Sequence, residues 1–161
     1  MHESSSIDPN QPKPALYAEI AAQVQALTEG ERDLIANLAN TASLLYHSMP
    51  DLNWVGFYLL KDGELVVGPF QGKPACVRIA LGKGVCGTAA ARRAPVIVAN
   101  VHEFAGHIAC DTASNAEIVV PILRNNELIG VLDVDSPKFA RFDAQDQAGL
   151  EKVVAALLKT L

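Results

Sequence analysis

A run of short apolar segments, each the length of one strand, fills the middle of this chain and limits what it can fold into. Two pairs of these segments flank tight turns: NWVGFYLL with ELVVGPF, and AEIVVPIL with ELIGVLDVD. Paired segments of this kind are typical of β-hairpins, in which neighbouring strands run antiparallel. The predicted turns are Lys61-Asp62-Gly63 and Arg124-Asn125-Asn126. ACVRIAL and PVIVA are two further candidate strands, and GVCGTAAARRA is predicted to form a short helix.

Helical patterns enclose this run of strands at both ends. Apolar residues recur at helical spacing between Leu16 and Leu27, and a second helix is predicted from about Glu31 to His47. A closing helix is predicted after Phe142, with Asp143 as its N-cap. We therefore predict an α+β fold, with a mainly antiparallel central sheet and the N- and C-terminal helices packed on one face.

Length and charge restrict the class of protein further. Residues 1–14 are polar and punctuated by prolines, so we interpret them as a flexible arm before a single domain at residues 15–161. The arm lacks the order of a signal peptide, and no apolar run is long enough to span a membrane. The formal net charge of -5 argues against a nucleic-acid partner. Three cysteines without a secretory signal favour a reducing compartment, the cytoplasm.

Alternation along the strands predicts two different sheet faces. Val55, Phe57, Leu132 and Val134 belong to an aliphatic face, whereas the opposite face collects aromatic and acidic side chains. The members of this second set are Trp54, Tyr58, Glu117, Asp133 and Asp135. Buried carboxylates need a cationic partner, so the set predicts a cup for a small ligand with an ammonium group and a short apolar tail. The alternative is that the tryptophan packs in the core and the acids lie on a solvated face.

Each of the three cysteines occupies or borders a predicted turn, and none belongs to a CxxC motif. Cys110 stands out because its loop, AGHIACDTASN, is small and polar, whereas unreactive cysteines are usually buried among apolar side chains. Cys86, between glycines, could merely pack at the start of a helix. His102, His107 and Cys110 are metal-ligand types, but their spacing matches no standard zinc pattern, so we predict no metal site.

Four motifs together resemble the free methionine-(R)-sulfoxide reductases, which are built on a GAF domain: WVGFYLL, GPFQGKPACVRIALGKGVCGTAA, the Cys110 loop running into AEIVVPI, and LIGVLDVDSP. The resemblance covers about Leu16 to Leu161 and implies that the predicted domain is a single GAF domain. It implies that Cys110 is the nucleophile, that Cys76 resolves it in a disulfide, and that Cys86 takes part in disulfide exchange. It also implies substrate binding by Trp54, Tyr58, Glu117, Asp133 and Asp135, and recycling by thioredoxin without any other cofactor.

The chemistry of sulfoxide reduction fits these residues independently. A thiolate must attack the sulfur while an acid protonates the departing oxygen, and a second thiol then condenses with the sulfenic acid. Clustered carboxyl groups in a partly dry pocket raise each other's pKa, so Glu117, Asp133 and Asp135 could donate that proton and also bind the substrate ammonium. Two alternatives stay open, a GAF-type module that binds a small ligand and a redox sensor without turnover. The oligomeric state is open between a monomer and a homodimer.

Overall fold

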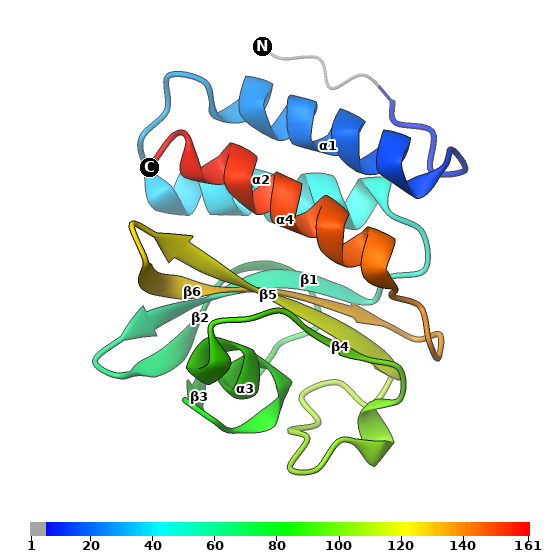
Figure 1. The fold of residues 1–161 in the computed structure, drawn as a ribbon, viewed down its shortest axis with the longest axis vertical. Helices are drawn as coiled ribbons and strands as arrows, with labels where there is room; N and C mark the ends of the chain where they lie inside the picture. Colours follow the sequence, from blue (N-terminus) through cyan, green and yellow to red (C-terminus); the bar gives the residue numbers. More distant parts are fainter. Residues whose placement is uncertain (1–5) are drawn as a thin grey trace.

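One antiparallel sheet forms the centre of the computed structural model, which describes residues 6–161 (Figure 1). The strand order within these residues is β3-β2-β1-β6-β5-β4, and every neighbouring pair is antiparallel. The strands are β1 (Trp54–Lys61), β2 (Glu64–Gly72), β3 (Arg78–Ala80), β4 (Val96–Val98), β5 (Ala116–Arg124) and β6 (Glu127–Ser136). The predicted antiparallel sheet is therefore confirmed, with β3 shorter than the ACVRIAL segment.

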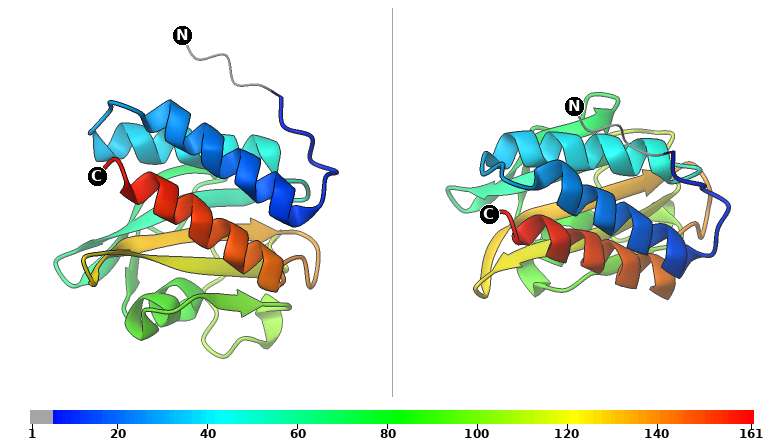
Figure 2. Two further views of the ribbon diagram at one scale, coloured as in Figure 1. Left: turned by 45° about the horizontal axis from the view of Figure 1, so that its top comes forward. Right: turned by 90° about the horizontal axis from the view of Figure 1, so that it is seen from above.

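Three helices cover one face of the sheet, as Figures 1 and 2 show: α1 (Lys13–Thr28), α2 (Leu34–Ser48) and α4 (Ala144–Leu158). The predicted packing of the N- and C-terminal helices on one face is confirmed. Helix α3 (Gly84–Arg92) and the short helix η1 (Val101–Glu103) lie on the opposite side, so that face is covered as well. Within residues 6–161, none of the helices combines the length and apolar character that a membrane crossing requires.

Local capping interactions explain where the helices begin. The Asp33 side chain accepts a hydrogen bond from the Ala36 N–H, so α2 starts three residues later than its apolar pattern predicts. Asp143 caps α4 as predicted and forms a reciprocal capping box with Asp146. Helix α1 begins at Lys13, inside the segment that we interpreted as a flexible arm. Residues 1–5 of that segment lie outside the described residues, and its flexibility stays a prediction.

Both predicted hairpin turns are present and use left-handed backbone conformations. Asp62 and Gly63 have φ values of 51° and 83°, and Asn125 and Asn126 have values of 50° and 64°. Two consecutive residues with positive φ make the type of turn whose twist matches that of the flanking strands. Aspartate, asparagine and glycine tolerate this conformation better than other residues. These turns therefore set the register of the adjoining residues, Lys61 opposite Glu64 and Arg124 opposite Glu127, and each strand pair shifts its register by one residue farther along.

The two sheet faces carry separate hydrophobic cores, as strand alternation predicts. Val55, Phe57, Leu132 and Val134 pack beneath the three helices. Trp54 and Tyr58 belong to a second cluster on the opposite face, which includes Val85 and Ala89 of α3. The aromatic residues of β1 are thus buried, and they belong to the smaller core beside the acidic side chains.

A buried carboxylate ties the helical layer together. Asp146 is 1% exposed, and its Oδ1 accepts hydrogen bonds from Tyr17 Oη at 2.8 Å and from Arg141 Nη1 at 3.3 Å. Its other oxygen, Oδ2, accepts from Lys13 Nζ at 2.6 Å. The Asp146 carboxylate on α4 thereby connects this helix to α1 through Lys13 and Tyr17, and to the segment before α4 through Arg141. A buried charge with two cationic partners and several hydrogen bonds is well compensated.

We expect Asp146→Ala to lower the free energy of unfolding by about 3 kcal/mol, because it leaves a partly buried lysine and arginine without their partner. Urea unfolding followed by circular dichroism measures this loss. Glu151→Ala, at an exposed position of the same helix, is the matched control and should change the value by about 0.5 kcal/mol or less. Equal effects of the two substitutions would contradict the role given to Asp146.

Candidate active site

The register of three neighbouring strands brings the predicted acidic residues together. Asp135 on β6 lies directly opposite Glu117 on β5 and opposite Trp54 on β1. Asp133 lies two residues away on the same face of β6, opposite Gly56. Side chains that are directly opposite on neighbouring strands lie about 5 Å apart at their Cβ atoms. The strands thus place three carboxyl groups and a tryptophan side by side on the face that α3 covers.

Three stacked aromatic rings form one wall beside the acids. The Trp54 ring stacks on Phe70 with 5.2 Å between ring centroids and on Tyr58 with 5.9 Å. Trp54 Nε1 donates a hydrogen bond to the carbonyl of Lys73 at 3.1 Å, which fixes the indole. Gly56 makes room for this stack, since a Cβ atom there would collide with the Trp54 ring and with Phe70. Phe70, which the sequence analysis did not identify, stacks on the Trp54 ring but does not line the pocket.

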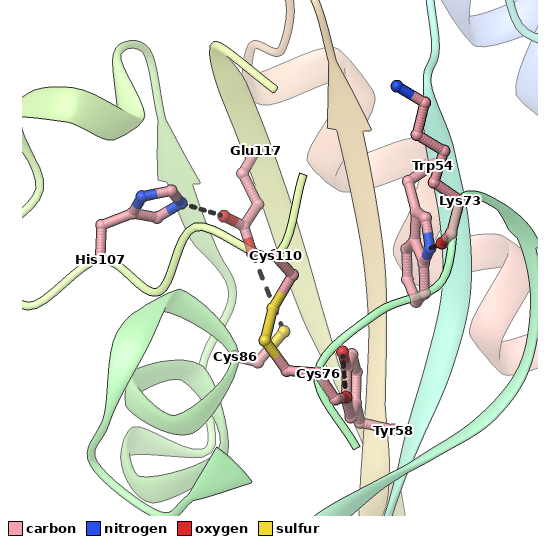
Figure 3. The surroundings of a disulfide bond; sticks show 8 residues. All are labelled: Trp54, Tyr58, Lys73, Cys76, Cys86, His107, Cys110 and Glu117. Atoms are coloured by element: carbon pink, nitrogen blue, oxygen red, sulfur yellow. Dashed lines mark hydrogen bonds and ion pairs between the residues drawn. A yellow bond between two sulfur atoms is a disulfide. The ribbon is translucent and has the colours of Figure 1, made fainter. Parts of the chain in front are cut away.

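Two of the cysteines form a disulfide next to the acids. The S–S bond between Cys76 and Cys110 joins the segment before β3 to the loop before β5 (Figure 3). Tyr58 Oη donates a hydrogen bond to the carbonyl of Cys76 at 3.1 Å. Asn53 Nδ2 donates to Asp111 Oδ2 at 3.1 Å and to Ser114 Oγ at 2.9 Å, which anchors the Cys110 loop to the start of β1. The pairing that the family resemblance implied is present in the structure.

Cys86 keeps a free thiol and lies in the first turn of α3. It is buried, and its Sγ donates to Glu117 Oε1 at 3.8 Å (Figure 3). Burial raises the pKa of this thiol, and the neighbouring charges of Asp133 and Glu117 raise it further. Cys86 therefore stays protonated near neutral pH and is a poor nucleophile in this environment.

All of these groups border one small pocket between the sheet, α3 and the Cys110 loop. The predicted site residues that line it are Trp54, Tyr58, Cys86, Cys110, Glu117, Asp133 and Asp135. Cys76 is bonded to Cys110 but does not line the pocket. The space in this pocket that the centre of a water molecule can reach is about 40 Å³. The residues of the predicted cup therefore border a real pocket. The open space in this pocket is small in the structure, in which the Cys76–Cys110 disulfide is formed.

Two of the acids in this pocket, Glu117 and Asp133, are buried and Asp135 is half-buried, and within the described residues no lysine or arginine forms an ion pair with them. Glu117 and Asp133 are each 6% exposed, and Oδ1 of Asp133 is buried without a hydrogen-bond partner. Burial raises the pKa of all three carboxyl groups well above the ordinary range, and repulsion between them adds to this effect. The raised pKa values favour the protonated, uncharged form of these acids, and the unpaired oxygen can accept a hydrogen bond from a ligand.

His107 also lines the pocket, where the sequence analysis had weighed it only as a metal ligand. Its Nε2 lies 3.7 Å from Glu117 Oε2 (Figure 3), and burial lowers the pKa of its imidazole. His102 instead contacts Asn115 Oδ1 at 2.8 Å, and the sulfur of Cys110 is bonded to Cys76. The His102, His107 and Cys110 set is therefore not gathered as metal ligands.

Cys86, Glu117 and Asp133 are the potential metal ligands that the described part of the chain does gather, with atoms within 4.8 Å of one another. Each of them has a raised pKa because it is buried. A metal ion would have to displace protons that burial makes hard to remove. The arrangement is better suited to donating protons and accepting hydrogen bonds from an organic cation, and we assign no metal to it.

Comparisons with known proteins show which family this chain resembles. The GAF domain family matches residues 46–157. A free methionine-R-sulfoxide reductase of Escherichia coli (strain K12) is 54% identical over 149 residues, or 92% of this chain and 90% of that protein. The solved structure of free methionine-R-sulfoxide reductase from Neisseria meningitidis, in complex with its substrate, is 42% identical with a TM-score of 0.89, covering 99% of this chain and 93% of that one. For fRMsr of Staphylococcus aureus in complex with substrate, the identity is 48%, the TM-score 0.88 and the coverage 98% and 99%.

The raised pKa values of the acids predict an unusual dependence of stability on pH. The unfolded chain releases these protons near pH 4, whereas the folded chain holds them to higher pH, so the unfolded state binds fewer protons. The free energy of unfolding should therefore fall as pH rises above about 4. We expect Asp133→Asn to flatten this decline and to be more stable than the wild type at about pH 8.

Urea unfolding at a series of pH values measures this slope. Asp62→Asn, in the exposed β1–β2 turn, is the control and should leave the slope unchanged. Asp143 does not disturb the comparison, because its hydrogen bond with Lys13 lowers its pKa to about 2 and it is ionised in both states above about pH 5. The lowered pKa of His107 makes stability rise with pH near 6.5 in the wild type and the variant alike, so the difference between their slopes is decisive, and equal slopes would show that Asp133 is not held protonated.

Proposed function

Because this chain belongs to the GAF domain family and, within it, to the free methionine-R-sulfoxide reductases, we propose that it reduces free methionine-(R)-sulfoxide to methionine with Cys110 as nucleophile. The observation that carries the proposal is the Cys76–Cys110 disulfide beside a pocket with buried acids and an aromatic wall. That combination offers a nucleophile, a second thiol that resolves it, and a proton donor within one site. The protein alone supplies the groups for one turnover, so the proposed reaction uses no further cofactor.

The proposed reaction begins with attack of the Cys110 thiolate on the sulfoxide sulfur. A carboxylic acid of the pocket gives its proton to the sulfoxide oxygen, methionine leaves, and Cys110 becomes a sulfenic acid. The Cys76 thiol then attacks the sulfenic sulfur, water leaves, and the disulfide forms. Electrons from an external dithiol, which we infer to be thioredoxin, restore both thiols. This cycle requires a reducing compartment, and we infer the cytoplasm.

Substrate recognition would divide between the acids and the aromatic wall. The α-ammonium of a free amino acid can donate to the unpaired Oδ1 of Asp133 and to the carboxyl oxygens of Asp135 and Glu117. The ring of Trp54 offers an apolar surface for the S-methyl group. Methionine within a peptide lacks this ammonium group, so we propose that the site selects the free amino acid.

Cys86 has a secondary place in this proposal. Its thiol is buried and has a raised pKa, so it does not compete with Cys110 as nucleophile. Its position beside Glu117 leaves it available for disulfide exchange when Cys76 is absent. We therefore assign the resolving role to Cys76 and only an exchange role to Cys86.

Substitution of single cysteines tests the assigned roles. Cys110→Ser should abolish methionine formation even with excess dithiothreitol, because no other thiol would attack the sulfoxide. Cys76→Ser should still complete one turnover and then stall as a sulfenic acid or recycle slowly through Cys86. Rapid-quench measurement of methionine and of free thiols distinguishes these states. Full single-turnover activity of Cys110→Ser would refute the proposal, and a protein that forms disulfides without producing methionine would be a sensor.

A cycle of substrates and variants tests the role of the acids. Asp133→Asn, Asp135→Asn and Glu117→Gln should each raise KM for free methionine-(R)-sulfoxide by about tenfold or more, because one charge-assisted hydrogen bond is worth roughly 1.5–3 kcal/mol. At least one of them should also lower the single-turnover rate by about 10²-fold through loss of the proton donor. With N-acetyl methionine sulfoxide, which has no ammonium, the wild type should already have a high KM that the variants do not raise further. An equal KM of the wild type for both substrates would mean that the acids bind something else.

A further inference from the structure

We propose that His107 is the proton-exchange partner of Glu117 and returns a proton to this buried acid after each reduction of the sulfoxide. The inference rests on the proposed function, because it concerns how the proton donor of that reaction is restored before the next turnover. It gives a role in the reaction to a loop histidine that the sequence motifs and the family resemblance left without one.

The two carboxyl oxygens of Glu117 face different partners. Oε1 accepts a hydrogen bond from the buried thiol of Cys86 at 3.8 Å, whereas Oε2 lies 3.7 Å from Nε2 of His107 (Figure 3). The second distance is slightly longer than a hydrogen bond, and contacts that transfer protons are often this long before the substrate binds. Oε2 is therefore the oxygen that can exchange a proton with the imidazole.

His107 lies at the border between this acid and solvent. Glu117 is 6% exposed, whereas His107 is half-buried and belongs to the loop before β5. Its neighbours in that loop, Gly106 and Ile108, are both exposed. The imidazole can thus bind a proton from water and give it to an acid that water reaches poorly.

Several other titratable groups border the pocket, but they are less suited to carry protons near neutral pH. Within residues 6–161 they are Tyr58, Cys86, Asp111, Asp133 and Asp135. Burial raises the pKa of Tyr58 and of Cys86, so these two groups keep their protons. A hydrogen bond from the Ala113 N–H lowers the pKa of Asp111, so this group has no proton to give.

The remaining acids do not replace the histidine either. Burial raises the pKa of Asp133 and Asp135 as it raises that of Glu117, so they release a proton with similar difficulty. The ordinary pKa of a histidine lies closest to neutral among these side chains, and burial lowers the pKa of His107 below that value. Its imidazole is therefore mostly uncharged at neutral pH and passes on a proton readily once it has bound one.

The disulfide form seen in the structure is the state in which the proton has to return. In the proposed reaction the Cys110 thiol loses one proton to the solvent as it becomes a thiolate, and Glu117 gives one proton to the sulfoxide oxygen. This oxygen leaves as water with the proton of the Cys76 thiol, so the Glu117 carboxylate is left without its proton. His107 then gives a proton from Nε2 to Oε2 and binds another from water, and no electrons move in this step. The Cys76–Cys110 bond holds the loop that carries His107 while this happens.

His107→Ala tests the return of the proton. Reduced enzyme is mixed with excess free methionine-(R)-sulfoxide and dithiothreitol at about pH 8, where protons are scarce, and methionine is measured by rapid quench. The first turnover uses a proton that Glu117 already holds, so we expect it to keep the wild-type rate. Later turnovers, extrapolated to saturating dithiothreitol, should slow by about tenfold or more, and imidazole added to the solution should restore them.

Two further variants separate proton exchange from simple positioning. His107→Gln keeps a polar side chain that can contact Oε2 but cannot carry a proton, so it should be as slow in later turnovers as His107→Ala. His47→Gln, at an exposed histidine on α2, is the matched control and should keep the wild-type rates. Wild-type turnover of either His107 variant would overturn the proposal. A first turnover of His107→Ala that is as slow as its later ones would also overturn it, because the residue would then only position Glu117.

A pH titration of the oxidised protein tests the same pair without any turnover. The ring signals of the histidines are followed by NMR, and those of His107 are assigned by their loss in His107→Gln. Because Nε2 lies beside Oε2, we expect the His107 signals to show a second step where Glu117 titrates, and this step should be absent from Glu117→Gln. The His47 signals should follow the same curve in both proteins.

Identical His107 curves in the wild type and in Glu117→Gln would overturn the proposed exchange between the two groups. The titration requires no substrate, so it can be interpreted even if the reduced enzyme forms no methionine. That second result would refute the proposed function separately.

Discussion

The register of β1, β6 and β5 is the constraint on which both the core and the pocket depend. Side chains alternate strictly between the two faces of a strand, so a slip of one residue would exchange the faces. The carboxyl group of Asp135 would then enter the helix-covered core, and Val134 would enter the pocket. The tight turn at Asn125-Asn126 places Arg124 opposite Glu127, and a register shift of one residue between Ile122 and Leu123 then brings Glu117 opposite Asp135 at the other end of the hairpin. The placement of the carboxyl groups in the pocket therefore depends on a turn and a register shift near the opposite end of the hairpin.

Carboxyl groups on the two sides of the sheet have opposite surroundings. On the helical side, Asp146 has a lysine, an arginine and a tyrosine as partners, so its charge stabilises the packing of α1 and α4. On the pocket side, Asp133 keeps an oxygen without a partner, and the acids around it repel one another. The contacts of Asp146 stabilise the fold. The acids of the pocket destabilise the fold at high pH, but their oxygens can accept hydrogen bonds from a bound cation. Stability from the helical layer allows the pocket to retain groups that destabilise the protein.

Local signals in the sequence predicted the parts of the structure that depend on local interactions. Strand alternation correctly divided the side chains between the faces, and turn residues located the hairpins. Phe70 was missed because the β1–β2 register shifts between Gly56 and Tyr58, so simple counting does not place it beside the tryptophan. The place of His107 depends on the path of a loop without regular structure, which periodicity cannot predict. The Cys76–Cys110 bond followed from family resemblance and not from spacing.

The small volume left in the pocket has a consequence for the order of events in the cycle. With the Cys76–Cys110 bond formed, Cys110 borders the pocket and the space that the centre of a water molecule can reach there is about 40 Å³. Under the proposed reaction, we infer that methionine leaves before the disulfide closes, because the substrate and the disulfide both need the space beside Cys110. The two half-reactions of the proposed cycle would then alternate in a ping-pong sequence, without a dead-end complex between oxidised enzyme and sulfoxide. In that cycle, excess sulfoxide would not obstruct the return of the enzyme to its reduced form.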